Sequence, residues 1–168
     1  EDIFVLNYDK EHCTLYQNEG DMFFIDVSKE AGLYFDTYDR VSWGVVLFDT
    51  EYDGDLDIFI SNGHVWPQID QTNHVLSYRQ QNQLFLNDGT GRFRNVTDEA
   101  GEVFATKRCS RGCAYGDLDG DGDLDVIVNE LDERPTIYEN LGGFENHWLG
   151  VRLTGTTSNR DALGSWVT

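Results

Sequence analysis

An internal repeat constrains the fold more than any other feature of this chain. Residues 39–61 align with residues 107–129 at an offset of 68, with nine identities in 23 positions. Residues 18–32 align with residues 87–101 at an offset of 69, with seven identities in 15 positions. A repeat of this length indicates a unit that buries its apolar surface by packing against its neighbours. We therefore expect a fold built from stacked copies of one unit.

Segments rich in β-branched and aromatic residues recur on both sides of two acidic loops, which is typical of short strands. The predicted strands are residues 13–18, 22–28, 43–49, 56–61, 82–88, 91–97, 111–117, 124–129 and 135–140. No 3.6-residue periodicity persists over the length of a helix. The pattern predicts an all-β fold of incomplete β-propeller blades, each a four-stranded antiparallel repeat. A β-sandwich is the competing architecture, although it would not require such self-similarity.

The same alignment predicts how the chain is divided. Asp2–Asn7 (DIFVLN) resembles Asp57–Asn62 (DIFISN) at four of six positions, so we expect the chain to begin within a repeat of a longer polypeptide. The predicted units are a partial blade (1–33), a full blade with an inserted loop at 63–81 (34–101), a further blade (102–145) and a C-terminal β segment (146–168).

The two acidic loops place carboxylates at matching positions. Counted from the first aspartate, side-chain oxygens fall at positions 1, 3, 5 and 9, a glycine at position 6 permits a tight bend, and position 7 offers its carbonyl oxygen. The candidate metal ligands are Asp49, Glu51, Asp53, Asp55 and Asp57 in the first loop and Asp117, Asp119, Asp121, Asp123 and Asp125 in the second.

Oxygen ligands in this number suit Ca²⁺, which takes six to eight of them in flexible geometry. Mg²⁺ resists dehydration, and Zn²⁺ prefers nitrogen or sulfur ligands that these loops lack. An EF-hand would need glutamate at position 12, where this chain has Ile60 and Val128. We expect two Ca²⁺ ions per chain and no separate ion at Asp2, because the earlier positions of its loop are absent.

The pattern D-x-[DE]-x-D-G-D-x-D followed by a strand resembles the FG-GAP and VCBS repeats of integrin-like β-propellers. Residues 146–167 (NHWLGVRLTGTTSNRDALGSWV) look like the opening of the ASPIC/UnbV segment found in relatives of cartilage acidic protein, and Ser61–Asp70 (SNGHVWPQID) also resembles these relatives. The resemblance implies a calcium-stabilised propeller in a secreted or surface protein. It implies roles in binding and adhesion rather than catalysis.

Composition restricts the partners. The formal net charge of −19 disfavours nucleic acid and anionic membrane surfaces. No apolar run approaches the length of a membrane span, so we expect no membrane insertion. Cys13, Cys109 and Cys113 give no disulfide or zinc framework, and we interpret them as buried small residues.

Further candidates lie outside the acidic loops. The inserted loop contains His64, Trp66, His74 and Tyr78, which could bind a sugar or peptide, although a loop that packs its own aromatic residues is the favoured interpretation. Metal binding by His64 and His74 is less favoured than ordinary histidine packing. Asn95 begins a glycosylation pattern, Asn-Val-Thr.

These observations lead to one main functional hypothesis, a non-catalytic extracellular calcium-binding module that binds protein or glycan. One alternative is a structural subunit of an extracellular fibre or matrix that self-associates through open strand edges. A further alternative is a polysaccharide-active propeller enzyme, for which His64 and Asp70 are the residues to test.

Overall fold

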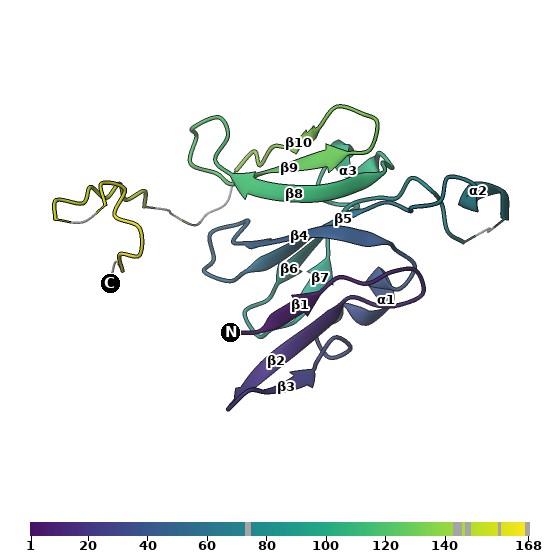
Figure 1. Cartoon of the computed structure of the whole chain (residues 1–168), viewed down its shortest axis with the longest axis horizontal. Coiled ribbons are helices and arrows are strands. Elements are labelled where there is room, and N and C mark those ends of the chain that lie inside the picture. The colour runs from purple at the N-terminus through teal and green to yellow at the C-terminus, as the bar shows by residue number, and fades with distance from the viewer. Residues whose placement is uncertain (73–74, 143–145, 147–148, 158, 167–168) are drawn as a thin grey trace.

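The computed structural model describes residues 1–72, 75–142, 146, 149–157 and 159–166. Its strands form three antiparallel sheets that follow one another in a stack (Figure 1). The first sheet contains β1 (Ile3–Val5), β2 (Thr14–Gly20) and β3 (Phe23–Asp26) in that order. The second contains β4 (Ser42–Phe48), β5 (Asp57–Asn62), β6 (Gln83–Asn87) and β7 (Phe93–Asn95). The third, in the order β10-β9-β8, contains β8 (Ser110–Gly116), β9 (Asp125–Glu130) and β10 (Thr136–Tyr138).

The all-β, propeller-like fold predicted from the repeat is confirmed, with four strands in the second sheet. The first and third sheets have three strands each among the described residues. Three helical turns, α1 (Tyr34–Thr37), α2 (Ile69–Thr72) and α3 (Glu102–Ala105), connect strands. No helix among the described residues is long and apolar enough to cross a membrane.

The predicted C-terminal β segment differs from the structure. The described residues of 146–168 contain turns but no strand. The one backbone hydrogen bond of this segment that closes a longer turn runs from the Gly155 amide to the Arg160 carbonyl, 2.9 Å apart. A strand requires a neighbouring strand to satisfy its backbone donors and acceptors, and the described part of the segment pairs with none. The resemblance on which the segment was predicted is therefore not accompanied by a strand in its described residues.

Strand β5 occupies the centre of the stack, and all of its residues are buried. Because successive side chains of a strand point to opposite faces, β5 contributes to two cores. Ile58 and Ile60 pack with Phe85 against the first sheet, where Cys13, Ala31 and Leu33 complete the cluster. Phe59 points the other way, toward the third sheet. A strand buried on both faces is what stacking of repeat units requires.

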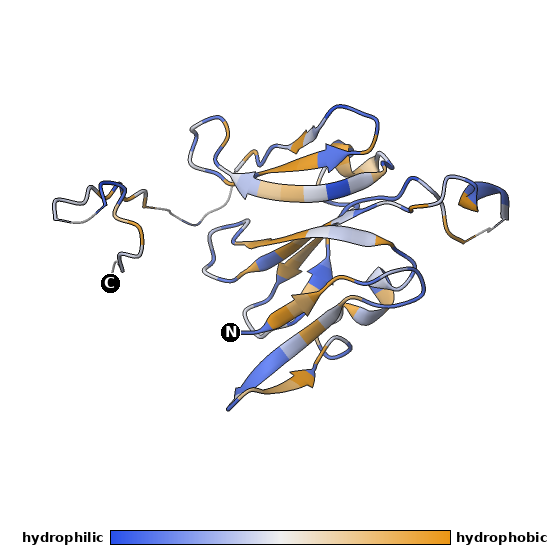
Figure 2. Ribbon diagram, in the orientation of Figure 1, coloured by the Kyte–Doolittle hydropathy of each residue, from blue (hydrophilic) through white to orange (hydrophobic). Residues whose placement is uncertain are grey.

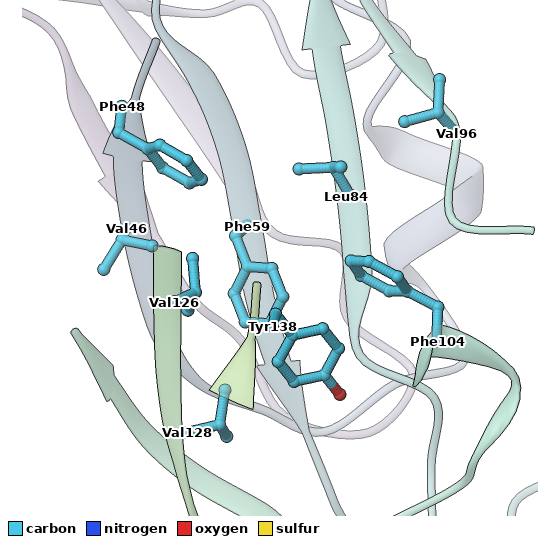
Figure 3. Close-up of a cluster of buried hydrophobic side chains, with 9 residues drawn as sticks. All are labelled: Val46, Phe48, Phe59, Leu84, Val96, Phe104, Val126, Val128 and Tyr138. Atoms are coloured by element: carbon cyan, nitrogen blue, oxygen red, sulfur yellow. The ribbon is translucent and has the colours of Figure 1, made fainter. Parts of the chain in front are cut away.

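The core between the second and third sheets is built around three aromatic rings. The ring of Phe59 lies 5.0 Å from that of Tyr138 and 6.0 Å from that of Phe104, measured between centroids (Figure 3). Val126 and Val128 of β9 complete the same cluster. Truncation of a buried phenylalanine to alanine costs about 3–5 kcal/mol, so this cluster is a principal source of the cohesion between these two sheets.

The two sheets also approach closely at their backbones. A Cβ added to Gly44 of β4 would lie 2.8 Å from the carbonyl oxygen of Arg111 and 2.8 Å from the amide nitrogen of Cys113, both in β8. The absence of a side chain at Gly44 therefore permits β8 to pack against β4. A Cβ added to the repeat-equivalent glycine, Gly112, would have no atom within 4 Å apart from those of its chain neighbours.

The three cysteines were interpreted from their spacing as buried small residues without a disulfide framework. Cys13 and Cys109 are buried and Cys113 is half-buried, and all three are free thiols. Burial raises the pKa of the Cys113 thiol, partly offset by a hydrogen bond to Ser61. These residues fill space in the cores, as small apolar side chains do.

Candidate metal centres

The second acidic loop, between β8 and β9, gathers three of its predicted ligands. One carboxylate oxygen from each of Asp117, Asp119 and Asp125 lies within 4.8 Å of the other two. Two oxygens bound to one Ca²⁺ at 2.3–2.6 Å are separated by no more than about 5 Å, so this spacing fits a shared ion. Asp117 and Asp119 are exposed, whereas Asp125 is buried at the start of β9.

The loop is shaped by its own carboxylates. Asp117 accepts hydrogen bonds from the amides of Gly120 (2.7 Å) and Gly122 (3.2 Å), and Asp121 accepts one from the Asp123 amide at 2.9 Å. Gly122 has φ of 99°, a conformation that favours glycine. In the first loop the equivalent Gly54 has φ of 95°, and Asp49 accepts bonds from the amides of Asp53 (3.1 Å) and Gly54 (2.9 Å).

The position-9 aspartates fasten each loop to the sheet. Asp57 accepts hydrogen bonds from the amides of Thr50 and Asn87, each at 2.9 Å. Asp125 repeats this arrangement with the amides of Leu118 and Asn140, also at 2.9 Å each. Each carboxylate thus joins the start of its loop to the end of the third strand of its repeat, and both of its oxygens already have a partner.

The strand-end asparagines were not predicted as part of the site. Asn87 and Asn140 accept hydrogen bonds from Gly89 and Gly142, two residues later, at 3.1 Å each. Asn18 accepts the same bond from Gly20 at 2.8 Å. The signal was present in the sequence, since Asn-x-Gly recurs at 18–20, 87–89 and 140–142.

Asp2 takes the place of a position-9 aspartate in the first sheet. It accepts a hydrogen bond from the Asn18 amide at 2.9 Å, as Asp57 does from Asn87. The only three-carboxylate group within ligand distance among the described residues is the one in the second loop, so Asp2 has no companion acids there. The expectation that Asp2 holds no ion of its own stays a prediction.

The first loop is arranged differently at positions 3 and 4. Glu51 and Tyr52 replace the Asp119 and Gly120 of the second loop, and the described residues of the first loop do not form an equivalent three-carboxylate group. Tyr52 has φ of 56°, a left-handed conformation that its glycine counterpart adopts without strain. The ligand assignments of Asp49, Glu51, Asp53, Asp55 and Asp57 therefore stay predictions.

Tyr52 links the two loops directly. Its hydroxyl donates a hydrogen bond to the carbonyl oxygen of Gly122 at 2.6 Å. Burial, followed by hydrogen bonding to Asp123 and the charges of nearby aspartates, raises the pKa of Tyr52 to about 12. Asn140 adds a second link, because its side chain donates to the Thr50 carbonyl at 2.9 Å. The two loops are thus neighbours at one edge of the stack.

The locations of the two position-7 side chains argue against a ligand role for these carboxylates. A Cβ on Gly89 would lie 2.8 Å from Asp55 Oδ2, and a Cβ on Gly142 would lie still closer to Asp123 Oδ2. Each position-7 carboxylate therefore sits over the Asn-x-Gly turn that follows the third strand. This leaves the backbone carbonyl as the group that position 7 can offer to an ion.

The electrostatics of the loops favour a bound cation. Burial, and then the charges of Asp57, Asp53 and Asp49, raise the pKa of Glu51. Burial also raises the pKa of Asp57. None of the ion pairs among the described residues includes an acid of either loop. The donor set of clustered carboxylates without cationic partners fits a hard divalent ion, Ca²⁺ above all.

Hydrogen bonds among its own residues hold the inserted loop, although Trp66 is 46% exposed, so packing of its aromatic residues stays a prediction. The buried His64 accepts a hydrogen bond from the Trp66 amide through Nδ1 (3.0 Å), and its own amide donates to the Tyr78 carbonyl (2.9 Å). Asp70 accepts a bond from the Tyr78 amide at 2.8 Å. His74 lies outside the described residues.

The side chain of Asn95 forms a local turn. Its Oδ1 accepts hydrogen bonds from the amide (3.1 Å) and hydroxyl (2.6 Å) of the buried Thr97. Asp26 and Ser28 form the equivalent turn in the first sheet, with distances of 3.0 and 2.5 Å. The Asn-Val-Thr pattern is therefore one copy of a repeated turn, and glycosylation of Asn95 stays a prediction.

Comparison with known proteins supports the repeat. Residues 74–128, which include the second loop and most of β9, match the FG-GAP-like repeat. No curated protein matches the chain. The chain thus contains an FG-GAP-like repeat within an all-β, propeller-like fold. The resemblance of residues 146–168 to an ASPIC/UnbV segment stays a prediction.

Proposed function

We propose that this chain is a calcium-binding, propeller-type module that acts outside the cell by binding a protein or a glycan. One Ca²⁺ binds in each acidic loop, through carboxylates at positions 1, 3, 5 and 9 and the carbonyl oxygen at position 7. The ion contributes rigidity, since it replaces the mutual repulsion of the carboxylates by attraction to a common centre. The module has no catalytic role in this proposal.

The observation that carries the proposal is the carboxylate group of Asp117, Asp119 and Asp125. It lies in a loop whose hydrogen bonding is repeated in the first loop, where Asp57 and its partners correspond to Asp125 and its partners. The matched FG-GAP-like repeat also supports a module of the integrin-like propeller type. The proposal of an extracellular location and of adhesion rests on this likeness alone.

Native mass spectrometry tests the calcium sites by counting bound ions. The intact chain should carry two Ca²⁺, whereas Asp53→Ala and Asp121→Ala should each carry one, because each variant loses a position-5 ligand. Glu19→Ala, which removes an exposed acid outside both loops, is the matched control and should keep two. Full calcium retention by either loop variant would show that the ligands are assigned wrongly.

The binding role needs a separate measurement. The calcium-loaded chain should be retained on a glycan array or on a panel of extracellular matrix proteins, and chelation should abolish that retention. The double variant Asp53→Ala/Asp121→Ala serves as a control for non-specific binding by an acidic surface. Binding that is equal with and without calcium would count against a module whose surface is ordered by these ions.

A further inference from the structure

The two acidic loops lie on the same side of the stack, opposite α1 and α2 (Figure 1). Hydrophilic residues dominate both loops (Figure 2). Their equivalent positions are 68 residues apart in the sequence, so any contact between the loops is made by the tertiary structure. Printed hydrogen bonds and one ring stack connect the two loops, and together these contacts show that the loops do not move independently.

A continuous chain of hydrogen bonds joins the two position-9 carboxylates. Asp125 accepts a bond from the amide of Asn140 at 2.9 Å, and the side chain of Asn140 donates to the Thr50 carbonyl at 2.9 Å. The amide of Thr50 in turn donates to Asp57 at 2.9 Å. Only two residues therefore separate a predicted ligand of the second loop from a predicted ligand of the first.

Tyr52 makes a second connection. Its hydroxyl donates a hydrogen bond of 2.6 Å to the carbonyl of Gly122, the residue before the position-7 carbonyl that is a predicted ligand. Tyr52 has φ of 56°, a conformation that is uncommon for a residue with a side chain, whereas its counterpart Gly120 has φ of 84°. The bond to Gly122 thus anchors the bend of the first loop on the bend of the second.

Two further contacts flank these connections. The ring of Phe48, the residue before Asp49, stacks on the ring of Tyr115 with centroids 5.4 Å apart. The side chain of Asn146 donates a hydrogen bond to the Glu51 carbonyl at 3.0 Å. The first loop is therefore bonded to the following repeat at positions 2, 3 and 4, so a change in the second loop acts directly on the first.

The two loops are not equally prepared for an ion. The second loop already gathers Asp117, Asp119 and Asp125 within ligand distance, whereas the described residues of the first loop form no equivalent group. The first loop must bring its carboxylates together when it binds, and this ordering reduces its affinity. Contacts that order the first loop beforehand would restore that affinity, and they come from the second loop.

We propose, on the basis of the calcium binding proposed above, that the two loops bind calcium cooperatively: the second loop fills first, and its occupancy raises the affinity of the first through Tyr52 and Asn140. Once the second loop is fixed, the hydrogen bonds restrict the first loop, which then loses less conformational freedom on binding. Because coupling between sites is reciprocal, occupancy of the first loop tightens binding at the second by the same factor.

Electrostatics acts in the opposite sense. Binding at either loop neutralises negative charge that attracts a cation to the other, in a chain of formal net charge −19. Added salt screens this effect but leaves the hydrogen bonds between the loops in place. The cooperativity should therefore become more marked as salt is raised. Coupling through charge alone would stay negative and only weaken.

Stepwise calcium affinities, measured by titration of the whole chain against a chromophoric chelator, test the coupling. Asp121→Ala leaves the first loop alone, and this loop should bind its ion about fivefold or more weakly than wild type binds its second. Asp53→Ala leaves the second loop alone and should bind its ion about as tightly as wild type binds its first. Asp119→Ala removes a different ligand of the second loop and should reproduce the result of Asp121→Ala, which separates loss of the site from an effect of one substitution on folding.

Tyr52→Phe removes only the hydroxyl that joins the loops. It should weaken the second binding step of wild type about threefold or more, as expected for one hydrogen bond, and should have little effect in the Asp121→Ala chain. A purely local role of Tyr52 would lower the affinity of the first loop equally in both chains. Tyr115→Phe is the matched control, because it keeps the ring stacked on Phe48 and removes a hydroxyl from a residue that is 50% exposed.

The outcomes distinguish the coupling from the calcium binding on which it depends. Equal affinities for the ion of Asp121→Ala and the second ion of wild type would overturn the coupling and leave two calcium sites. An equal effect of Tyr52→Phe in both chains would overturn the role of Tyr52. Tighter binding by Asp121→Ala than by Asp53→Ala would reverse the order of filling. A wild-type chain that binds no calcium would instead refute the proposed function itself.

Discussion

Replacement of Gly44 by alanine should weaken the packing of the second sheet on the third. The added Cβ would meet Ser61 Oγ at 2.7 Å, and the Arg111 carbonyl oxygen and Cys113 amide nitrogen at 2.8 Å each. The serine hydroxyl can rotate away. The two backbone atoms can move only if β8 itself shifts, and the aromatic core next to β8 resists that shift.

The magnitude can be isolated with a matched control. Overpacking of this kind costs about 1–3 kcal/mol, while Gly→Ala also stabilises by about 0.4–1 kcal/mol because it restricts the unfolded chain. Gly112→Ala has the second effect without the first, since a Cβ there meets none of its neighbours within 4 Å. Neither glycine has a positive φ. The difference between the two variants is therefore the cost of the contact, about 1–3 kcal/mol.

Urea unfolding in saturating calcium measures this difference, with the slope of free energy against urea concentration checked for constancy. Gly44→Ala should unfold at a lower urea concentration than wild type or show a gain smaller than that of Gly112→Ala. The measurement should be made at low protein concentration, where self-association does not contribute. Equal stability of the two alanine variants would refute the claim that the β4–β8 contact depends on a missing side chain.

Three other predictions concern the loops and the core. Chelation of calcium should lower the melting temperature by about 5–11 °C per site at 100 times the dissociation constant, and an unchanged melting curve in chelator would contradict calcium-linked folding. Asp57→Asn should destabilise the folded chain by about 1–3 kcal/mol even in chelator, because the new side-chain NH₂ would face one of the two backbone amides that donate to Asp57. Asp53→Asn is the control and should lose only the stability that depends on calcium. Burial raises the pKa of Tyr138 to about 12, so stability should fall as pH rises from about 10, where the unfolded tyrosine ionises, toward 12. Tyr138→Phe should reduce this alkaline dependence in denaturation curves, and the remainder comes from Tyr52, whose pKa is raised in the same way.

The strands and the acidic loops could be predicted because each depends on residues that lie close together in the sequence. Alternating β-branched and aromatic residues between glycine-rich turns indicated each strand, and the register of the repeats gave the antiparallel units. The position-6 glycines, Gly54 and Gly122, adopt the left-handed conformations that the tight bend required. Spacing at positions 1, 3, 5 and 9 was sufficient to find both candidate loops, since the predicted ligands of each loop lie within nine residues of one another.

The remaining features of the site depend on residues far apart in the chain. The hydrogen bond from Asn87 to Asp57 spans 30 residues, and that from Tyr52 to Gly122 spans 70. No local pattern could show that the second loop gathers three carboxylates while the first, with Glu51 and Tyr52, does not. The C-terminal segment was predicted as β from a resemblance, but a strand forms only where a partner strand satisfies its backbone.

The sequence by itself determined that this chain is a repeat of short antiparallel strands with an acidic loop in each full unit. The alternation of side chains along a strand and the spacing of aspartates in a loop each extend over only a few residues. Both can therefore be recognised in the amino-acid sequence. Only the tertiary structure decided which face of each strand is covered. Phe59 is buried and its equivalent Ile127 is exposed, because burial depends on whether another sheet stacks against that face and not on the residue's own pattern.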